Sequence, residues 1–238
     1  MPSVDQLKVK IFADGADKAG MLEMYKRPYV KGFTTNPSLM RKAGVTDYEA
    51  AAKNIVAAIP DRSISFEVFA DDFSEMERQA RKITTWGELV SVKIPITNTN
   101  KESAIPLVRK LSQEGIALNV TAIFTLDQVQ DVIDAVKGGA PCFVSVFAGR
   151  IADTGLDPVP IMAESVKRLK AAPNTELIWA SPRELLNIFQ ADEIGCHVIT
   201  VTNDIINKLS LVGKDMHEYS LETVKIFFED GKAAGYKL

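Results

Sequence analysis

Cysteine and histidine are scarce in this 238-residue chain, which contains two of each. Cys142 and Cys196 lie far apart in strand-like segments, so we expect two reduced, buried thiols and no disulfide. His197 and His217 have no metal-binding pattern around them, and we expect structural or solvated roles for both. This scarcity argues against a metal centre built from cysteine and histidine.

Long apolar runs and a net positive charge are also missing. No segment reaches the roughly 18 unbroken apolar residues of a membrane span, and Met1–Asp5 has neither the basic nor the apolar part of a secretory signal. The net charge of -3 offers no attractive field to nucleic acid or to an anionic membrane. We therefore expect a cytoplasmic protein that has no nucleic-acid or membrane partner and that meets anionic ligands through local clusters of basic residues.

Strand-like and helix-like segments alternate along the chain. The strand-like runs are 8–13, 29–35, 63–69, 89–96, 116–122, 142–147, 175–180 and 197–202, and the helical signals are 16–26, 46–59, 73–86, 101–114, 125–137, 157–171 and 183–191. Short strands that alternate with helices predict a parallel sheet of the α/β class, and the number of strands predicts a single (β/α)₈ TIM barrel over residues 1–238. An open, doubly wound sheet is the alternative, but it usually carries a glycine-rich first turn, which this chain lacks.

A further helix is predicted at about 220–234, where Leu221, Val224, Phe227 and Phe228 recur at helical spacing. A barrel has already covered its strands with helices, so this extra helix has no strand left to cover. It either caps the barrel or packs on a neighbouring subunit, and the sequence leaves both open.

Lys93 is the only charged residue in the strand-like segment 90–96. Because side chains alternate between the two faces of a strand, Ser91 and Lys93 share one face while valines and isoleucines occupy the other. Lysine is almost never fully buried without a partner. The pattern therefore predicts polar partners for Lys93 on neighbouring strands.

Such partners follow from the same alternation in other segments, because the C-terminal strand ends of a barrel form one rim. The predicted pocket contains Asp14, Thr35, Asn36, Glu67, Asn119, Thr121, Ser145, Phe147, Arg150, Ser181 and Arg183 around Lys93. For Asp14, Thr35 and Ser181, a helix cap or a loop position is an equally good interpretation.

A buried lysine among carboxylates and amides favours one kind of chemistry. Desolvation lowers the pKa of an amine, and the free amine condenses with a carbonyl to form a Schiff base. Carboxylates supply the proton transfers, and Arg150 and Arg183 have the forked geometry that binds phosphate.

At this point the chain resembles the transaldolase family, in the short branch that also includes fructose 6-phosphate aldolases. The most specific stretches are Thr34-Thr35-Asn36-Pro37-Ser38 and Val92-Lys93-Ile94-Pro95. Weaker matches follow the family's order, namely Phe12-Ala13-Asp14, Ser65-Phe66-Glu67-Val68, Asn119-Val120-Thr121, Phe147-Ala148-Gly149-Arg150-Ile151 and Ser181-Pro182-Arg183.

The resemblance implies that Lys93 forms the Schiff base and that Asp14 takes the proton of the C4 hydroxyl. It also implies that Glu67 and Thr121 hold the catalytic water. Further implied contacts are those of Asn36, Asn119 and Ser145 to the three-carbon unit and those of Arg150, Ser181 and Arg183 to a phosphate. The resemblance further implies sugar-phosphate substrates, no metal or organic cofactor, and a ring-like homo-oligomer such as a pentamer or decamer.

Two positions favour transfer over cleavage: Glu67 and Phe147 stand where the aldolase branch has glutamine and tyrosine. Phe147 offers no proton to the enamine, so the dihydroxyacetone unit would wait for an acceptor aldose phosphate. Trp179, Pro182 and Val146 depart from the family pattern, and Trp179 is expected either to fill the barrel beneath the phosphate site or to belong to the core. An aldolase that releases dihydroxyacetone, a transaldolase for a sulfonated sugar analogue, and a non-catalytic sugar-phosphate-binding barrel remain alternatives.

Overall fold

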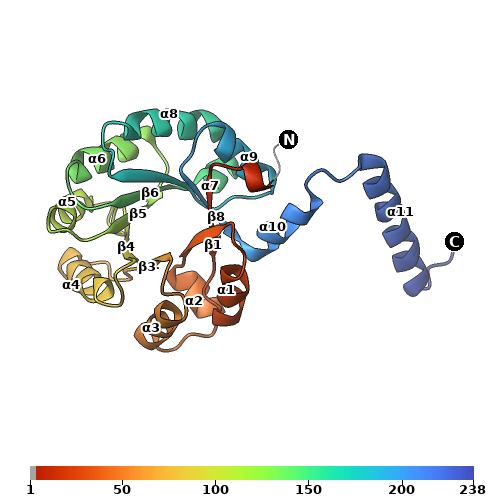
Figure 1. Cartoon of the computed structure of the whole chain (residues 1–238), viewed down its shortest axis with the longest axis horizontal. Helices are drawn as coiled ribbons and strands as arrows, with labels where there is room; N and C mark the ends of the chain where they lie inside the picture. Colours follow the sequence, from red (N-terminus) through yellow and green to blue (C-terminus); the bar gives the residue numbers. More distant parts are fainter. Residues whose placement is uncertain (1–3) are drawn as a thin grey trace.

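The computed structural model describes residues 4–238, whose parallel strands close into a barrel in chain order (Figure 1). The strands are β1 (Lys10–Asp14), β2 (Val30–Thr34), β3 (Ser63–Glu67), β4 (Val90–Pro95), β5 (Leu118–Ile123), β6 (Cys142–Val146), β7 (Thr175–Trp179) and β8 (Val198–Thr202). Each predicted strand overlaps one of these. The (β/α)₈ TIM barrel expected from the sequence is confirmed.

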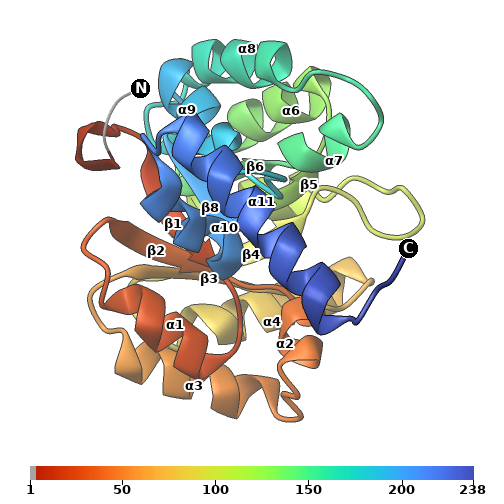
Figure 2. The ribbon, with the colours of Figure 1, turned by 90° about the vertical axis from the view of Figure 1, so that its right-hand side faces the viewer.

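Helices follow the strands, and all the long ones except α11 pack around the outside of the barrel (Figures 1 and 2). They are α1 (Lys18–Tyr25), α2 (Pro37–Lys42), α3 (Tyr48–Ala58), α4 (Phe73–Thr84), α5 (Ile105–Gln113), α6 (Leu126–Val136), α7 (Ala148–Ala152), α8 (Val159–Leu169), α9 (Leu186–Glu193), α10 (Asn203–Asn207) and α11 (Met216–Ala233), with 3₁₀ turns η1 (Val4–Gln6) and η2 (Lys208–Leu211). The prediction lacks α2, α7 and α10, because five or six residues are too few to show a helical period. Within residues 4–238 no helix is long and apolar enough to cross a membrane.

A small apolar cluster fills part of the barrel interior. Phe12 and Phe143 meet edge to face, with ring centroids 5.6 Å apart, and they pack with Ile178 and Val198. A Cβ atom at Gly32 would lie 2.6 Å from the Phe12 ring, so glycine makes room for this plug. The next inward-facing residues after those of the plug line the cavity described below; they are Asp14, Ser145, Ala180 and Thr200.

Trp179 faces away from the barrel interior. It is fully buried and packs in the core between strands and helices, whereas Ile178 and Ala180 face inward. The prediction that Trp179 fills the barrel is therefore wrong, and its interpretation as a core residue is confirmed. The physical reason is Ser181: its φ of 61° lies outside the extended region, so Trp179 and Ser181 do not share a face as they would on a regular strand.

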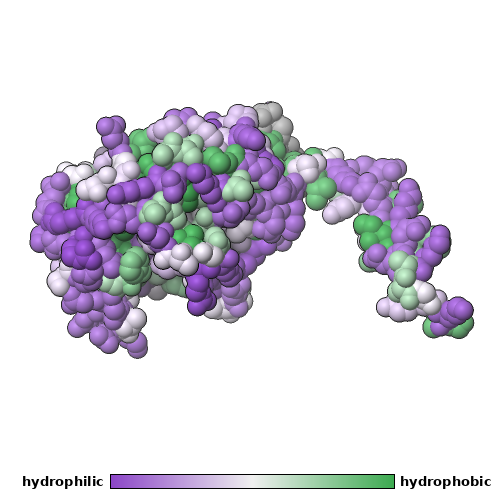
Figure 3. Space-filling model, turned by 90° about the horizontal axis from the view of Figure 1, so that it is seen from below, coloured by the Kyte–Doolittle hydropathy of each residue, from purple (hydrophilic) through white to green (hydrophobic). Residues whose placement is uncertain are grey.

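The final helix, α11, stands apart from the barrel (Figure 1). It begins four residues earlier than predicted, at Met216, because Asp215 accepts hydrogen bonds from the backbone N–H groups of His217 and Glu218. None of its 18 residues is buried. Hydrophobic residues, in green, lie on the surface of this arm in Figure 3. The helix contains Phe227 and Phe228, which are 70% and 65% exposed.

Candidate active site

A cavity of about 110 Å³ opens at the C-terminal ends of the strands. Its lining consists of Asp14, Thr34, Asn36, Lys93, Thr121, Ser145, Phe147, Arg150, Ala180, Ser181 and Thr200. Most of the predicted site residues therefore meet in one cavity. The exceptions are Thr35, Glu67, Asn119 and Arg183, which do not line it.

Lys93 is the buried cation of this cavity, with a side chain that is 8% exposed. Its Nζ lies 3.2 Å from Oε2 of Glu67 and donates to the carbonyl oxygen of Thr35 at 3.3 Å. The register of β3 and β4 pairs Glu67 directly with Lys93. Glu67 and Thr35 thus belong to the site through their contact with the amine, and the need of a buried charge for a partner is met.

Asp14 lies at the end of β1 and lines the same cavity as Lys93. Its Oδ1 accepts a 2.7 Å hydrogen bond from Oγ1 of Thr34, whose hydroxyl also bonds to that of Thr200. Burial raises the pKa of Asp14 above its ordinary value, while the nearby charge of Lys93 and the Thr34 hydrogen bond act in the opposite direction. The carboxyl group near the amine therefore binds a proton more readily than an ordinary aspartate does.

Asn119 is fully buried beneath the cavity wall. Its Nδ2 donates to Oγ of Ser65 at 3.0 Å, and its Oδ1 accepts from Oγ of Ser145 at 2.7 Å. Asn119 thereby orients Ser145, which lines the cavity. The hydroxyl of Thr121 is also buried, and among residues 4–238 it has no hydrogen-bond partner, so it is available to a ligand or a water molecule.

Asn36 both caps a helix and lines the cavity. Its Oδ1 accepts from the backbone N–H of Leu39 at 2.9 Å and so begins α2, where Pro37 occupies the first turn. This cap orients the side chain and leaves its amide NH₂ for the cavity. Asn36 thus caps α2 and also lies in the cavity.

The two arginines differ in their surroundings. Arg150, on α7, lines the cavity, and its guanidinium lies 5.8 Å from the centroid of the Phe147 ring. Arg183 is turned toward Asp153: its Nε donates to Oδ1 at 2.9 Å, and its Nη2 pairs with Oδ2. This bidentate pair lowers the pKa of Asp153 and occupies the fork that a phosphate would use.

Close backbone packing joins α7 to the end of β7. A Cβ atom at Gly149 would lie 1.6 Å from the carbonyl oxygen of Ser181, so only glycine fits at this position. Ser181 itself has a φ of 61°. The contact fixes Arg150 and Ser181 relative to each other on one side of the cavity.

Thr34, Thr200 and Asp153 are absent from the predicted site. Thr34 and Thr200 were detectable, since alternation along their strands places them on the same inward face as Asp14. Asp153 follows the short helix α7, and no feature of the sequence indicates that it pairs with Arg183 across 30 residues.

The cysteines and histidines take no part in the cavity. Cys142 and Cys196 are free and buried as expected, and burial raises the pKa of both thiols to about 12. His197 accepts a hydrogen bond at Nδ1 from the backbone N–H of Leu177, which is the structural role expected for it. Within residues 4–238 no group of three or more histidine, cysteine, aspartate or glutamate residues is placed to hold a metal ion.

The fold and the site together define a (β/α)₈ barrel with a lysine-centred polar site at its C-terminal rim. The family model described as Transaldolase/Fructose-6-phosphate aldolase matches residues 11–238. The chain therefore belongs to the transaldolase/fructose-6-phosphate aldolase family.

Curated relatives agree with this assignment. A probable transaldolase of Dehalococcoides mccartyi is 35% identical over 202 residues, which cover 84% of this chain and 90% of that protein. A probable transaldolase of Thermoanaerobacter sp. is 33% identical over 231 residues, which cover 97% of this chain and all of that protein. The alignment with the second relative thus includes the segment that carries α11.

Solved structures share the fold at low sequence identity. A dihydrodipicolinate synthase from Rhodopseudomonas palustris superposes with a TM-score of 0.61 at 13% identity, covering 97% of this chain and 81% of that one. A mandelate oxidase superposes with a TM-score of 0.58 at 12% identity, covering 85% of this chain and 67% of that one. At these identities the likeness shows the barrel fold alone.

Proposed function

We propose that this protein is a transaldolase, which moves a dihydroxyacetone unit from a ketose phosphate to an aldose phosphate through a Schiff base on Lys93. The observation that carries the proposal is the buried amine of Lys93, 3.2 Å from Glu67 and in the same cavity as Asp14. An amine with two carboxylates near it has the groups that imine formation and carbon-carbon cleavage need.

The first half of the reaction forms the imine. The Lys93 amine attacks the donor's ketone carbon, and the resulting carbinolamine loses water to give a protonated Schiff base. Glu67, which contacts the amine, and Thr121, whose buried hydroxyl is available, hold the water and move its protons. Ser145, oriented by Asn119, and Asn36, fixed by its cap, bind the hydroxyl groups of the three-carbon unit.

The second half breaks and remakes a carbon-carbon bond. Asp14 takes the proton of the C4 hydroxyl, the C3–C4 bond breaks, and its electron pair enters the Schiff base to give an enamine on Lys93 as the aldose phosphate leaves. The enamine then attacks the carbonyl carbon of an acceptor aldose phosphate, and hydrolysis releases the new ketose. Phe147 lines the cavity without a hydroxyl to protonate the enamine, which favours transfer over release.

Arg150 and Ser181 are the proposed contacts of the phosphate, with Arg183 at the margin. Arg150 and Ser181 line the cavity on the side of β6 and β7, and Nη1 of Arg183 lies 3.4 Å from Oγ of Ser181. A sulfonate would bind the same groups, because it presents a similar array of anionic oxygens.

Borohydride trapping tests the Schiff base. The protein is incubated with fructose 6-phosphate and sodium borohydride, digested, and analysed by mass spectrometry. We expect a reduced three-carbon adduct on the peptide that contains Lys93, and no adduct in Lys93→Ala. Failure to find the adduct in the unaltered protein would leave only the non-catalytic sugar-phosphate-binding barrel.

Turnover with and without an acceptor separates transfer from cleavage. With fructose 6-phosphate as donor, we expect product formation to depend on added erythrose 4-phosphate. Free dihydroxyacetone released at the same rate without an acceptor would instead identify an aldolase. The same assay with a sulfonated acceptor tests the anionic group.

We further propose that the protein is a cytoplasmic homo-oligomer, a pentamer or decamer, in which α11 packs on a neighbouring subunit. The support is the 18-residue helix without a single buried residue, which carries exposed Leu221, Val224, Phe227 and Phe228. Native mass measurement tests the assembly, and Phe227→Ser with Phe228→Ser is expected to dissociate it. A monomer in the unaltered protein would contradict this proposal and leave the catalytic one unaffected.

A further inference from the structure

The C-terminal end of β3 lacks a neighbouring strand on one side. Pairing of β2 with β3 ends at Thr34 and Ser65, and the last backbone hydrogen bond runs from Thr35 N–H to the Ser65 carbonyl at 3.1 Å. The chain then leaves the sheet at Pro37, where α2 begins. Pairing with β4 continues further, since the Val68 N–H donates to the carbonyl of Lys93 at 3.0 Å.

The main-chain groups of Glu67 consequently face the side where β2 has ended. Along a strand, successive residues direct their N–H and C=O groups to opposite neighbours, so those of Glu67 point away from β4. An unpaired buried N–H or C=O group is costly. A side chain must supply the missing bonds if this end of β3 is to keep its position.

The hydroxyl of Tyr48 supplies them. Glu67 N–H donates to Oη of Tyr48 at 3.1 Å, and the same hydroxyl donates to the Glu67 carbonyl oxygen at 3.1 Å. The Tyr48 ring is fixed between Phe69 and Trp86, with centroid distances of 5.4 Å and 6.0 Å. Burial raises the pKa of Tyr48, so the hydroxyl keeps the proton that it donates.

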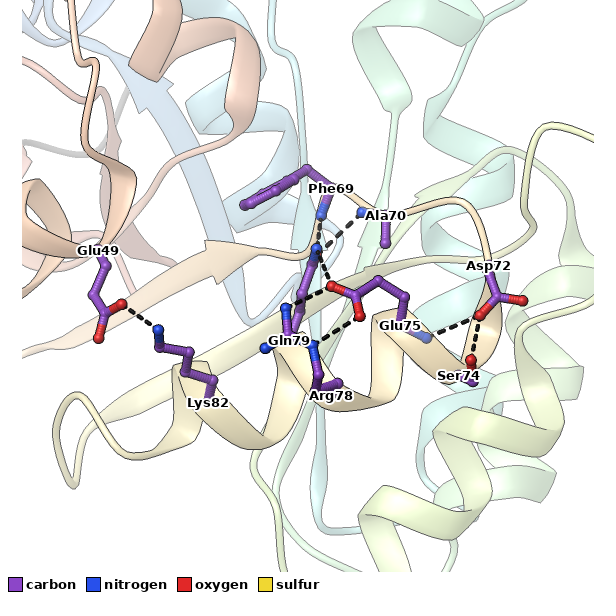
Figure 4. A network of polar contacts seen from close by, with 9 residues as sticks. All are labelled: Glu49, Phe69, Ala70, Asp72, Ser74, Glu75, Arg78, Gln79 and Lys82. Atoms are coloured by element: carbon purple, nitrogen blue, oxygen red, sulfur yellow. Dashed lines mark hydrogen bonds and ion pairs between the residues drawn. The ribbon is translucent and has the colours of Figure 1, made fainter.

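Gln79 on α4 holds the residues that follow. Its Oε1 accepts from the backbone N–H groups of Phe69 and Ala70 at 2.9 Å and 3.1 Å, as Figure 4 shows. Its Nε2 donates to Glu75 at 3.3 Å, which fixes the orientation of the amide. Side chains from α3 and α4 thus hydrogen-bond to the backbone of residues 67–70, beyond the point where pairing with β2 ends.

We propose that Tyr48 and Gln79 are positioning residues that hold the carboxylate of Glu67 against the amine of Lys93. The proposal rests on the function proposed above for Glu67 and Lys93. Tyr48 contacts the main chain of Glu67 itself, so a shift of this backbone moves the carboxylate that lies 3.2 Å from the amine. Misplacing a catalytic group by about 1 Å is enough to reduce turnover by roughly 100-fold.

Tyr48→Phe removes both hydrogen bonds and keeps the ring. We expect kcat to fall by about 10-fold, with KM for the donor and acceptor changed by less than about twofold, because the substrate contacts remain. In a Glu67→Gln background the same substitution is expected to cause no further loss, since Tyr48 acts through Glu67. Losses that multiply in the double variant, or an unchanged kcat in Tyr48→Phe, would overturn the proposal.

Tyr25→Phe is the matched control. It also loses one tyrosine hydroxyl, which donates to Asp61 at 2.8 Å, but Tyr25 ends α1, before β2, at the opposite end of the barrel. We expect its kcat to remain unchanged. Gln79→Leu is a second variant, which keeps the Tyr48 bonds and removes the acceptor of Phe69 and Ala70; a smaller fall in kcat is expected.

Amide hydrogen exchange separates this proposal from the function on which it rests. Faster exchange over residues 67–70 in Tyr48→Phe, with no change there in Tyr25→Phe, is expected whether or not the protein is a transaldolase. Unchanged exchange over that segment would overturn the positioning role. Absence of the Lys93 adduct in the unaltered protein would instead overturn the proposed function.

Discussion

The charged residues at the two ends of the site differ in burial. At one end Lys93 is buried, pairs with Glu67, and lies near Asp14, whose pKa is raised by burial. At the other end Arg150 and Arg183 are exposed, and Arg183 pairs with Asp153 at the surface. The two groups differ in the number of basic and acidic side chains, and they differ more in how far those side chains are exposed to water.

This difference assigns the two ends different tasks. Charges out of contact with water interact strongly and shift the pKa values of their neighbours, which is what proton transfer requires. Exposed charges are screened, so they contribute mainly to the recognition of an anion. Substitutions at the buried end should therefore change kcat, and those at the exposed end should change KM.

The largest effect is expected for Asp14→Asn. Without the carboxylate, the C4 proton has no acceptor, and we expect kcat to fall by about 100-fold or more. Lys93 keeps its amine, so borohydride should still fix the donor to it, now with the mass of the whole sugar phosphate. Recovery of the three-carbon fragment at the normal rate would remove Asp14 from the proposed role.

Arg150→Ala is expected to act on binding. Loss of a charge-assisted contact raises KM for a phosphorylated substrate by roughly 10-fold to 100-fold, with kcat nearly constant. D-glyceraldehyde without a phosphate serves as the control acceptor, for which KM should not change. Arg183→Ala should raise KM less than Arg150→Ala does, because the guanidinium of Arg183 is already paired with Asp153. A larger rise in KM for Arg183→Ala would show that the Arg183–Asp153 pair separates when substrate binds.

Asp14→Asn should also stabilise the fold at neutral pH. A raised pKa means that the folded state favours the protonated carboxyl, so the stability that Asp14 contributes is present below about pH 4 and is lost as pH rises through its folded pKa. We expect the variant's Tm to exceed that of the unaltered protein by about 2–4 °C at pH 7, the effect of about 1 kcal/mol. Thermal scans from pH 4 to pH 8 should show that the difference in Tm between the variant and the unaltered protein grows with pH. A difference that shrinks as pH rises would contradict a raised pKa of Asp14.

The smallest effect is expected for Asp153→Asn. Exposed ion pairs contribute little, so freeing the guanidinium of Arg183 from Asp153 should lower KM for a phosphorylated substrate by no more than about fivefold. The effect should disappear with an acceptor that has no anionic group. A rise in KM would mean that Asp153 orients Arg183 for the substrate and does not compete with it.

The sequence predicts the barrel well because its signals are strong and repeated. Alternation around Lys93 identifies β4 and its inward face, and the same period recurs in every strand that carries Glu67, Asn119 or Ser145. These residues come together because a parallel barrel places equivalent strand positions at one level. Local pattern and fold topology are sufficient for this half of the site.

The rest depends on contacts that local patterns do not encode. Tyr48 reaches Glu67 from α3, and Asp153 meets Arg183 across a gap of 30 residues in the chain. Trp179 was misplaced because one residue with positive φ, Ser181, shifts the apparent alternation. Loop geometry and contacts between helices and strand ends are set by packing of the whole molecule, so they appear only in the structure.

The plug formed by Phe12, Phe143, Ile178 and Val198 bears on the kinetics of the proposed transfer. It lies below a cavity of about 110 Å³ whose lining residues belong to the C-terminal rim, so we expect substrates to enter and leave from the rim. The donor and the acceptor would then bind through the same opening of the cavity. The first aldose phosphate must leave before the acceptor aldose phosphate binds. Initial-rate plots at several acceptor concentrations should accordingly give the parallel lines of a ping-pong mechanism.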